Sequence, residues 1–142
     1  MNPTIEKFGY PATLIKEYEH WLVLLRPLQV TLGSLVLAAK SDATAFGALP
    51  APAFAEQSVV IGAIEDALRS FVEYERINYL MLMMVDPNVH LHVIPRYSEA
   101  RIWRGAEFPD AGWPGPPRLD ASQSLDHGQI AALTAEISFD FR

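Results

Sequence analysis

Asn88, His90 and His92 are the residues of this 142-residue chain whose types and spacing are best suited to chemistry. They alternate with apolar residues over 88–93, and successive side chains of a β-strand point to opposite faces. The amide and the two imidazoles would therefore share one face, with the apolar residues in the core. Side chains two residues apart on a strand lie about 6.5 to 7 Å apart, close enough to act on one substrate group. The pattern predicts a strand from Val89 to Tyr97 with one polar row.

Two neighbouring imidazoles are suited to several kinds of chemistry, and their spacing alone does not choose among them. A neutral imidazole is a nucleophile near pH 7 and can attack phosphorus. A second imidazole can donate to the leaving oxygen or to a non-bridging oxygen. Both can instead bind a metal such as zinc, although His20 and His127 do not complete an evident ligand set. The pair can also be purely structural, hydrogen-bonded to backbone groups on a partly exposed strand.

The composition narrows the class of protein. Half of the residues are hydrophobic, which is enough for a core, and the absence of cysteine removes disulfides and thiolate metal sites. A net charge of −6 argues against a nucleic acid polymer as partner, because such proteins usually carry a basic face. The chain shows neither an apolar run of membrane-spanning length nor a secretory signal pattern. We expect a cytoplasmic protein of one domain, residues 1–142, with no membrane partner.

Several elements must position the histidine strand. Two short strands are expected within residues 12–26, joined near Glu19, and a third from Thr31 to Ala39. Gly33 in the third strand indicates a bulge or a close approach of another group to the backbone. A long helix follows, from about Pro52 to Tyr74, with one apolar stripe. An apolar strand from Arg76 to Met84 then pairs with the histidine strand as an antiparallel hairpin in the middle of the sheet.

The last third of the chain differs in composition. Residues 98–123 are rich in proline and glycine and predict an extended, irregular segment. We expect its aromatic side chains, Trp103, Phe108 and Trp113, to pin it to the body of the protein; stacking on a base and sealing of a dimer are the alternatives. A final helix begins near Asp126, where the carboxylate and Gln129 can form a capping box. Antiparallel strands with helices gathered on one side describe an α+β fold.

The run Asn88-Val-His-Leu-His-Val-Ile-Pro-Arg96 resembles the signature of the histidine triad (HIT) superfamily, His-x-His-x-His followed by two apolar residues. The segment from Gly33 to Lys40 resembles that family's strand after the first hairpin, and the long helix precedes a strand that contains Asn78. The similarity covers about residues 10–97. It implies a HIT-like antiparallel sheet of about five strands with a long helix packed on it, to which residues 98–142 add an irregular loop and a C-terminal helix.

The resemblance also implies an activity, that of a nucleotide hydrolase or transferase acting at the α-phosphate. In such proteins the middle histidine attacks phosphorus, and water or another acceptor resolves the nucleotidyl-histidine intermediate. Carried over by position, His90 is the nucleophile, His92 contacts the phosphate and the leaving group, and position 88 orders the nucleophile through a hydrogen bond. The family usually forms two-fold dimers, so a homodimer is implied. No cofactor is expected.

This chain departs from the family pattern at Asn88, which stands where the first histidine is expected. An amide can donate a hydrogen bond but cannot carry a positive charge. If position 88 only orients the nucleophile, the loss of rate is modest. If its charge matters, the loss is on the order of 10²-fold. The alternatives are therefore a nucleotide-binding protein with weak or no turnover, or, less favoured, a metal site on the two histidines.

Three further residues are candidates for contact with substrate. Arg96 follows the motif and can bind phosphate bidentately, or it is a solvated arginine at the end of the strand. Asn78 lies in an otherwise apolar strand, where its amide either contacts ribose or phosphate or satisfies nearby backbone groups. Ser34 stands where many members of the family have a further histidine, so it is assigned to the substrate-binding set by position.

Overall fold

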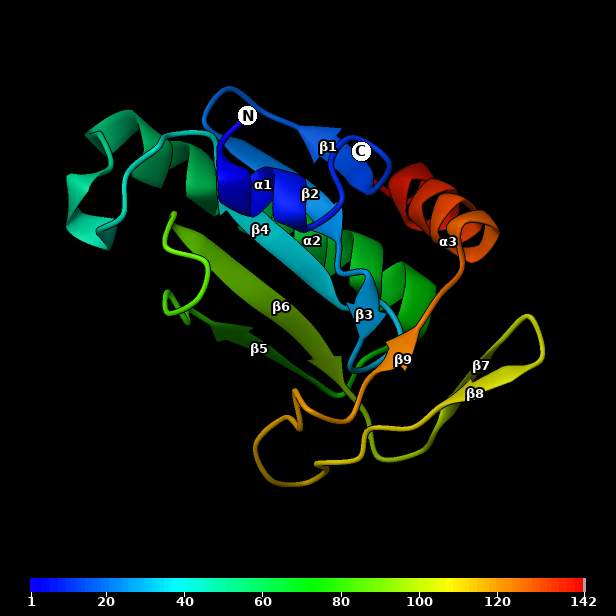
Figure 1. Cartoon of the computed structure of the whole chain (residues 1–142). Helices are drawn as coiled ribbons and strands as arrows, with labels where there is room; N and C mark the ends of the chain where they lie inside the picture. The colour runs from blue at the N-terminus through cyan, green and yellow to red at the C-terminus, as the bar shows by residue number, and fades with distance from the viewer. Residues whose placement is uncertain (142) are drawn as a thin grey trace.

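A computed structural model describes residues 1–141, and a five-stranded antiparallel sheet in the order β1-β2-β4-β6-β5 lies at its centre (Figure 1). The strands of this sheet are β1 (Leu14–Glu17), β2 (Trp21–Leu25), β4 (Leu35–Ala39), β5 (Arg76–Leu80) and β6 (His90–Arg96). The helical elements of the same range are α1 (Pro3–Lys7), the 3-10 turn η1 (Phe46–Ala48), α2 (Ala51–Val72) and α3 (His127–Phe139). Two small ribbons pair β3 (Leu28–Gln29) with β9 (Gln123–Ser124), and β7 (Arg101–Trp103) with β8 (Ala106–Phe108). The α+β class and the five-stranded antiparallel sheet are confirmed.

Strands β2 and β4 form the middle of the sheet, and every residue of both is buried. Consecutive apolar residues suit a strand that is covered on both faces. Strand β6 pairs with β4 on one side and with β5 on the other. Its register places His92 beside Val36 and His90 beside Ala38. The histidines therefore lie in the interior of the sheet rather than at an edge.

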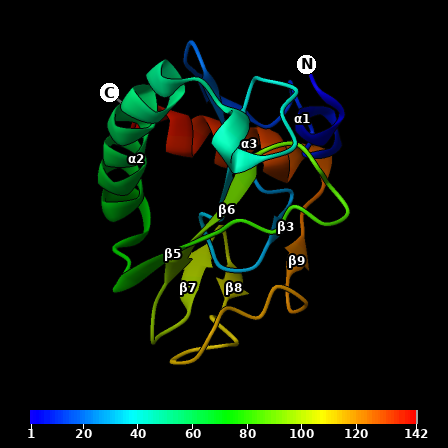
Figure 2. The same ribbon diagram turned by 90° about the vertical axis from the view of Figure 1, so that its left-hand side faces the viewer.

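Helices cover both faces of the sheet, which corrects the expectation that they gather on one side. Figure 2, which views the sheet nearly along its edge, shows α2 on one side and α1 on the other. The α2 side holds the larger core, to which α3 contributes Leu133 and Ile137. On the α1 side, Ile5 and Phe8 pack on the alternate residues of β2 and β4, namely Leu22, Leu24, Val36 and Ala38. Helix α1 was not predicted because five residues are too few to show a helical period.

The strand predicted from Arg76 to Met84 is too long, and its place in the sheet was wrong. Strand β5 ends at Leu80 and lies at the edge of the sheet. Residues 81–89 form a loop, in which the side chain of Met84 is 85% exposed. The apolar composition of this loop resembled a strand, so the boundary could not be read from hydropathy alone.

The segment 98–123 is less irregular than predicted, because it contains the β7–β8 hairpin and β9. Arg104 and Gly105 both have positive φ, 51° and 80°, as a tight two-residue hairpin turn requires. Trp103 and Phe108 are buried, and the indole N–H of Trp103 donates to Glu136 of α3 at 2.5 Å. Aromatic side chains therefore do pin this segment to the body of the protein, as expected.

Two local predictions are confirmed in detail. Asp126 caps α3 and forms the capping box with Gln129. Gly33 has φ +92°, and a Cβ added there would lie 3.2 Å from a methyl group of Leu68, so the helix does approach the backbone closely at this point. Within residues 1–141, no helix combines the length and the apolar character needed to cross a bilayer.

Candidate functional site

The two motif histidines lie in contact on the face of β6 that α1 covers. Their ring centroids are 5.1 Å apart, and the rings meet edge to face at 81°. The ring of Phe8, directly after α1, lies over both, with centroids 5.5 Å from His90 and 5.6 Å from His92. The histidine row is therefore an enclosed aromatic cluster rather than an open groove.

His90 is fully buried, at 0% exposure, and one of its two ring nitrogens is unpartnered. Nδ1 lies 2.7 Å from the backbone carbonyl oxygen of Asn88. Because a carbonyl oxygen only accepts, Nδ1 carries the hydrogen and Nε2 keeps its lone pair. Among the described residues nothing bonds to Nε2, although buried polar atoms are nearly always satisfied. The arrangement leaves an oriented lone pair that no other group of the described residues uses.

His92 is held in the opposite tautomer by Arg26. The guanidinium Nε of Arg26 lies 3.3 Å from Nδ1 of His92 and can only donate, so the ring hydrogen of His92 resides on Nε2. Burial, followed by the charge of Arg26 and then by His90, lowers the pKa of His92 to about 4. The nearby Asp86 opposes this shift in pKa without overcoming it. At neutral pH His92 is therefore an uncharged hydrogen-bond donor.

The side chain of Asn88 is bound to other parts of the protein. Its Oδ1 accepts from the hydroxyl of Thr4 at 2.9 Å, and its Nδ2 donates to the carbonyl oxygen of Asp42 at 3.0 Å. The hydrogen bond between this residue and His90 uses the main-chain carbonyl, which every amino acid supplies. The side chain at position 88 thus joins α1 to the loop before α2.

The N-terminal residues 2–8, here called the N-terminal cover, close the histidine row from one side. Asn2 caps α1, and its Nδ2 donates to the carbonyl oxygen of Ala39 at 3.1 Å. Nζ of Lys7 forms an ion pair with Asp86 at 2.8 Å, in the loop before β6. With the bond between Thr4 and Asn88, these contacts fix the cover at both ends and in the middle. Nε2 of His90 is closed to solvent, so a ligand can reach it only if a group that covers the row moves.

Arg96 and Asn78 meet each other in a separate cluster. The guanidinium of Arg96 binds Asp110 bidentately, at 2.6 and 3.1 Å, and also donates to Asn78 at 2.7 Å and to the carbonyl of Gly115 at 2.9 Å. These bonds use four of its five N–H groups. A phosphate would have to compete with a buried carboxylate, so a substrate-binding role for Arg96 and Asn78 stays a prediction.

Ser34 is occupied within its own turn. Its hydroxyl donates to the carbonyl of Thr31 at 2.8 Å and accepts from the backbone N–H of Thr31 at 3.0 Å. Its carbonyl oxygen accepts from the backbone N–H of Arg26 at 3.0 Å. The substrate-binding role of Ser34 stays a prediction, whereas its contact with the backbone of Arg26 is observed. Arg26 itself was missed, and the one signal in the sequence is a charged residue between an apolar strand and Pro27.

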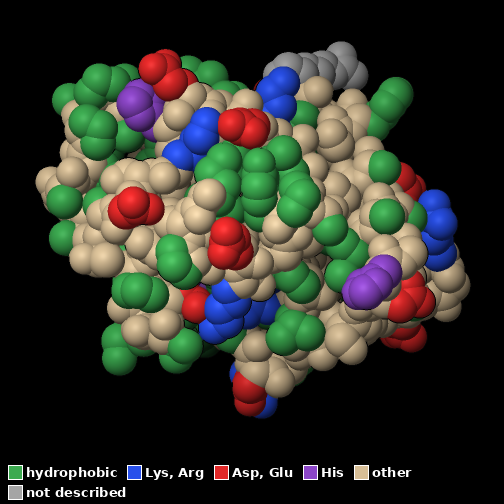
Figure 3. Space-filling view, turned by 45° about the horizontal axis from the view of Figure 1, so that its top comes forward, with side chains coloured by type: hydrophobic (Ala, Val, Ile, Leu, Met, Phe, Trp, Pro, Cys, Tyr) green, Lys and Arg blue, Asp and Glu red, His purple; other side chains and the backbone are tan. Residues whose placement is uncertain are grey.

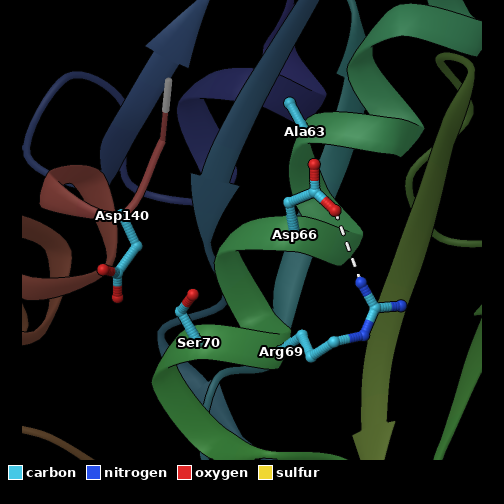
Figure 4. Close-up of a pocket in the computed structure, with 5 residues that line it drawn as sticks. All are labelled: Ala63, Asp66, Arg69, Ser70 and Asp140. Carbon is cyan, nitrogen blue, oxygen red and sulfur yellow. Dashed lines mark hydrogen bonds and ion pairs between the residues drawn. The ribbon is translucent and has the colours of Figure 1, made fainter.

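Other surfaces of the described residues present fewer groups that could bind a ligand or react with it. A hollow of about 430 Å³ between α2 and the end of α3 contains the exposed pair Arg69 and Asp66, which bind each other (Figure 4). Within residues 1–141, no group of three or more His, Cys, Asp or Glu side chains is arranged to hold a metal ion. On the face shown in Figure 3, acidic, basic and hydrophobic side chains are interspersed, without a continuous basic field.

The five-stranded sheet, the helices on both of its faces and the histidine row on β6 define an α+β protein. No protein-family model and no curated protein matches the sequence. Solved structures do match. A histidine triad protein from Bradyrhizobium japonicum has a TM-score of 0.74 and 18% identity, over 100% of this chain and 97% of that one.

Two further solved structures of histidine triad proteins match over nearly the whole chain. A histidine triad protein from Sinorhizobium meliloti 1021 has a TM-score of 0.75 and 19% identity, over 99% of this chain and 96% of that one. A hypothetical histidine triad nucleotide-binding protein from Sulfolobus tokodaii has a TM-score of 0.67 and 18% identity, over 96% and 88%. The chain has the fold of the histidine triad proteins, which confirms the resemblance at the level of the fold.

Proposed function

We propose that this protein binds a nucleotide or nucleotide conjugate at the histidine row and hydrolyses or transfers it at the α-phosphate. The observation that carries the proposal is the unpartnered Nε2 of His90. The carbonyl of Asn88 lies 2.7 Å from Nδ1, on the other side of the ring, and so holds His90 in the tautomer whose Nε2 is the nucleophile. A nucleotide as ligand is further supported by the likeness to histidine triad proteins, one of which is named as nucleotide-binding.

The reaction begins at Nε2 of His90. Its lone pair attacks the α-phosphorus, a P–N bond forms, and the bond from phosphorus to the leaving group breaks with its electron pair on the leaving group. The ring now carries a positive charge, which the carbonyl of Asn88 stabilises through Nδ1–H. Water then attacks phosphorus, the P–N bond breaks, one proton goes to solvent, and His90 returns to its neutral form.

His92 stabilises the phosphate in this scheme but is a poor source of protons. Its Nε2–H can donate a hydrogen bond to a phosphate oxygen, because Arg26 occupies Nδ1. An uncharged imidazole has no proton to give up at neutral pH, so the leaving group departs as an anion or takes its proton from water. The site therefore favours conjugates with phosphate or carboxylate leaving groups over those with amines.

Asn88 is compatible with this chemistry. Its orienting hydrogen bond to His90 comes from the main chain, so replacement of the first motif histidine does not remove it. What the amide cannot supply is a positive charge, and Arg26, directly after β2, brings one to the row. These contacts support a structural rather than a chemical role for the side chain of Asn88.

A second candidate function is binding of a nucleotide without turnover. The complete burial of His90 and the position of Phe8 over both histidines favour it, because the nucleophile is closed off as the chain stands. Binding of AMP without conversion of any AMP conjugate would identify this case. Covalent modification of Nε2 of His90 by a nucleotide conjugate would instead indicate catalysis.

The test is to incubate the protein with diadenosine tetraphosphate, whose leaving group is a phosphate, and to look for a covalent AMP by mass spectrometry under non-acidic conditions. Adenosine 5′-phosphoramidate, whose leaving group is an amine, should react more slowly. We expect an adduct that maps to His90 and is absent from His90→Ala. His20→Ala is the matched control, since this histidine lies outside the row, and it should form the adduct normally. A folded wild-type protein that forms neither adduct nor hydrolysis product rules out the catalytic proposal.

We also propose a homodimer. The family resemblance supports it, as do the unpaired edge of β5 and the exposed side chains of the following loop, with Val85 at 82% exposure. Light scattering during gel filtration gives the molar mass, and a monomeric mass at micromolar concentration contradicts the proposal.

A further inference from the structure

Arg26 is fixed in place by both its backbone and its side chain. Its backbone N–H donates to the carbonyl of Ser34 at 3.0 Å, at the point where β2 ends. In the side chain, Nε donates to His92 and Nη1 donates to the carbonyl of Leu28 at 2.5 Å. An arginine side chain that is bound at two of its nitrogens has already lost most of its rotamer freedom, which lowers the entropic cost of binding a ligand with it.

The charge of Arg26 has no counterion in the described part of the chain. The ion pairs within residues 1–141 involve other cations, and the contrast with Arg96 is informative. Arg96 is also withdrawn from solvent, and it binds the carboxylate of Asp110. Burial lowers the pKa of Arg26, with no opposing carboxylate. Arg26 is half-buried, and a charge withdrawn from water is costly unless it is paired, so this guanidinium is suited to receive an anion.

Space for an anion lies beside it. A hollow of about 150 Å³ is lined by Lys7, Phe8, Arg26, Pro27 and Leu28. That volume is the share of roughly five water molecules at about 30 Å³ each, enough for the five heavy atoms of a phosphate group. Phe8 lines this hollow and also contacts both imidazoles. Lys7 adds a second cation, although it is paired with Asp86.

We propose that Arg26 binds the anionic group of the ligand at the histidine site, a phosphate of a nucleotide conjugate, while its Nε keeps His92 as an Nε2–H donor toward the same group. Nη2, which makes no hydrogen bond within the described residues, is the donor available to a phosphate oxygen. This inference rests on the proposed function, because it assigns the phosphate contact of the same site. It also moves that contact from Arg96, which already binds a carboxylate, to Arg26.

The test compares a ligand with its phosphate-free counterpart. Binding of AMP, adenosine and inorganic pyrophosphate is measured by calorimetry for wild type, Arg26→Gln, Arg26→Lys and the control Arg69→Gln. Arg69 suits the control because its side chain is 62% exposed and binds Asp66 of α2 and Tyr74 just after that helix. In parallel, NMR follows the pH titration of His92. If Arg26 had only a structural role, the pKa of His92 would not depend on the charge at position 26.

We expect Arg26→Gln to weaken AMP and pyrophosphate by about 10- to 100-fold and to leave adenosine nearly unchanged, because a charged hydrogen bond is lost. Arg26→Lys keeps the charge but lacks the planar guanidinium, so its affinity for AMP and pyrophosphate should lie between those of wild type and Arg26→Gln. The pKa of His92 should rise in Arg26→Gln and not in Arg69→Gln. If Arg26→Gln does not fold, the ratio of AMP to adenosine affinity in Arg26→Lys decides.

Several outcomes overturn the assignment. One is an unchanged affinity for AMP in Arg26→Gln, and another is an equal loss for adenosine and AMP. Wild-type protein that binds neither AMP nor pyrophosphate also overturns it. The fate of the proposed function is read separately, from the covalent AMP on His90. If the adduct forms but AMP binds equally well without Arg26, only the role of Arg26 is contradicted. If pyrophosphate binding depends on Arg26 but no adduct forms, the anion site is supported and nucleotidyl transfer is contradicted.

Discussion

The hydroxyl of Thr4 donates to Oδ1 of Asn88 at 2.9 Å, so the residue at the first motif position is bound to the N-terminal cover through its side chain. Asn88 contacts His90 through its backbone carbonyl instead. The position has two separate functions, which substitutions can distinguish. The main chain orients the nucleophile, and the side chain holds the cover.

Asn88→Ala should therefore affect stability more than chemistry. It leaves the hydroxyl hydrogen of Thr4 without its acceptor and the carbonyl of Asp42 without its donor, at a cost of about 1–3 kcal/mol in the free energy of unfolding. The rate of adduct formation on His90 should change by less than about tenfold. Thr4→Val serves as the control, because it removes the same hydrogen bond from its other end, together with the one that the hydroxyl accepts from the backbone N–H of Asn88. A loss of rate of about 10²-fold in a folded Asn88→Ala protein would show that the amide takes part in the chemistry.

Phe8 is the barrier between solvent and the histidine row, so Phe8→Ala should expose Nε2 of His90. We expect faster modification of His90 by diethyl pyrocarbonate, by at least about tenfold, together with a destabilisation of about 3–5 kcal/mol from the lost ring. Phe54→Ala is the control, since that ring is 37% exposed on α2. Equal modification rates in wild type and Phe8→Ala mean that another segment closes the site.

The stability of the protein should fall as the pH falls through the titration range of His92. Its pKa is lowered to about 4 in the folded state, whereas an unfolded histidine has a pKa of about 6.5. Between these values the unfolded chain binds more protons, so acid favours unfolding. The free energy of unfolding should drop by about 2 kcal/mol from about pH 7 to about pH 5 because of this group.

His92→Gln isolates this contribution, because glutamine does not titrate and its side-chain oxygen can still accept from Arg26. Urea unfolding at both pH values measures the effect, and the variant should lose markedly less stability than wild type over this range. If the two proteins lose the same amount of stability, His92 is not held neutral in the folded state.

The row of His90 and His92 was predictable because it depends on the shortest structural period, the alternation of a strand. The N-terminal cover was not, because its position depends on contacts with residues far along the chain. Asn2 bonds to Ala39, 37 residues away, and Thr4 bonds to Asn88, 84 residues away. Local sequence over five helical residues contains no information about such partners.

Arg26 shows the same limit inside the site. Its neighbour Leu25 pairs with Leu35 of β4, and Leu35 pairs with Val93 of β6, next to His92. The contact between Arg26 and His92 therefore depends on the register of three strands. Sequence patterns indicate that each strand exists but do not align one with another, and so Arg96, adjacent to the motif, was chosen instead.

Arg96 should prove essential to the fold through its carboxylate partner. Its side chain is 4% exposed and that of Asp110 is 1% exposed, so removing one charge leaves the other buried and unpaired. Asp110→Asn should lower the free energy of unfolding by about 3–5 kcal/mol. Asp120→Asn is the matched control, because its pair with Arg118 is 74% and 58% exposed and should contribute less than about 1 kcal/mol. Denaturant titration measures both. Similar losses in the two variants contradict a buried pair, and unchanged AMP binding in Asp110→Asn assigns Arg96 to the fold rather than to the ligand.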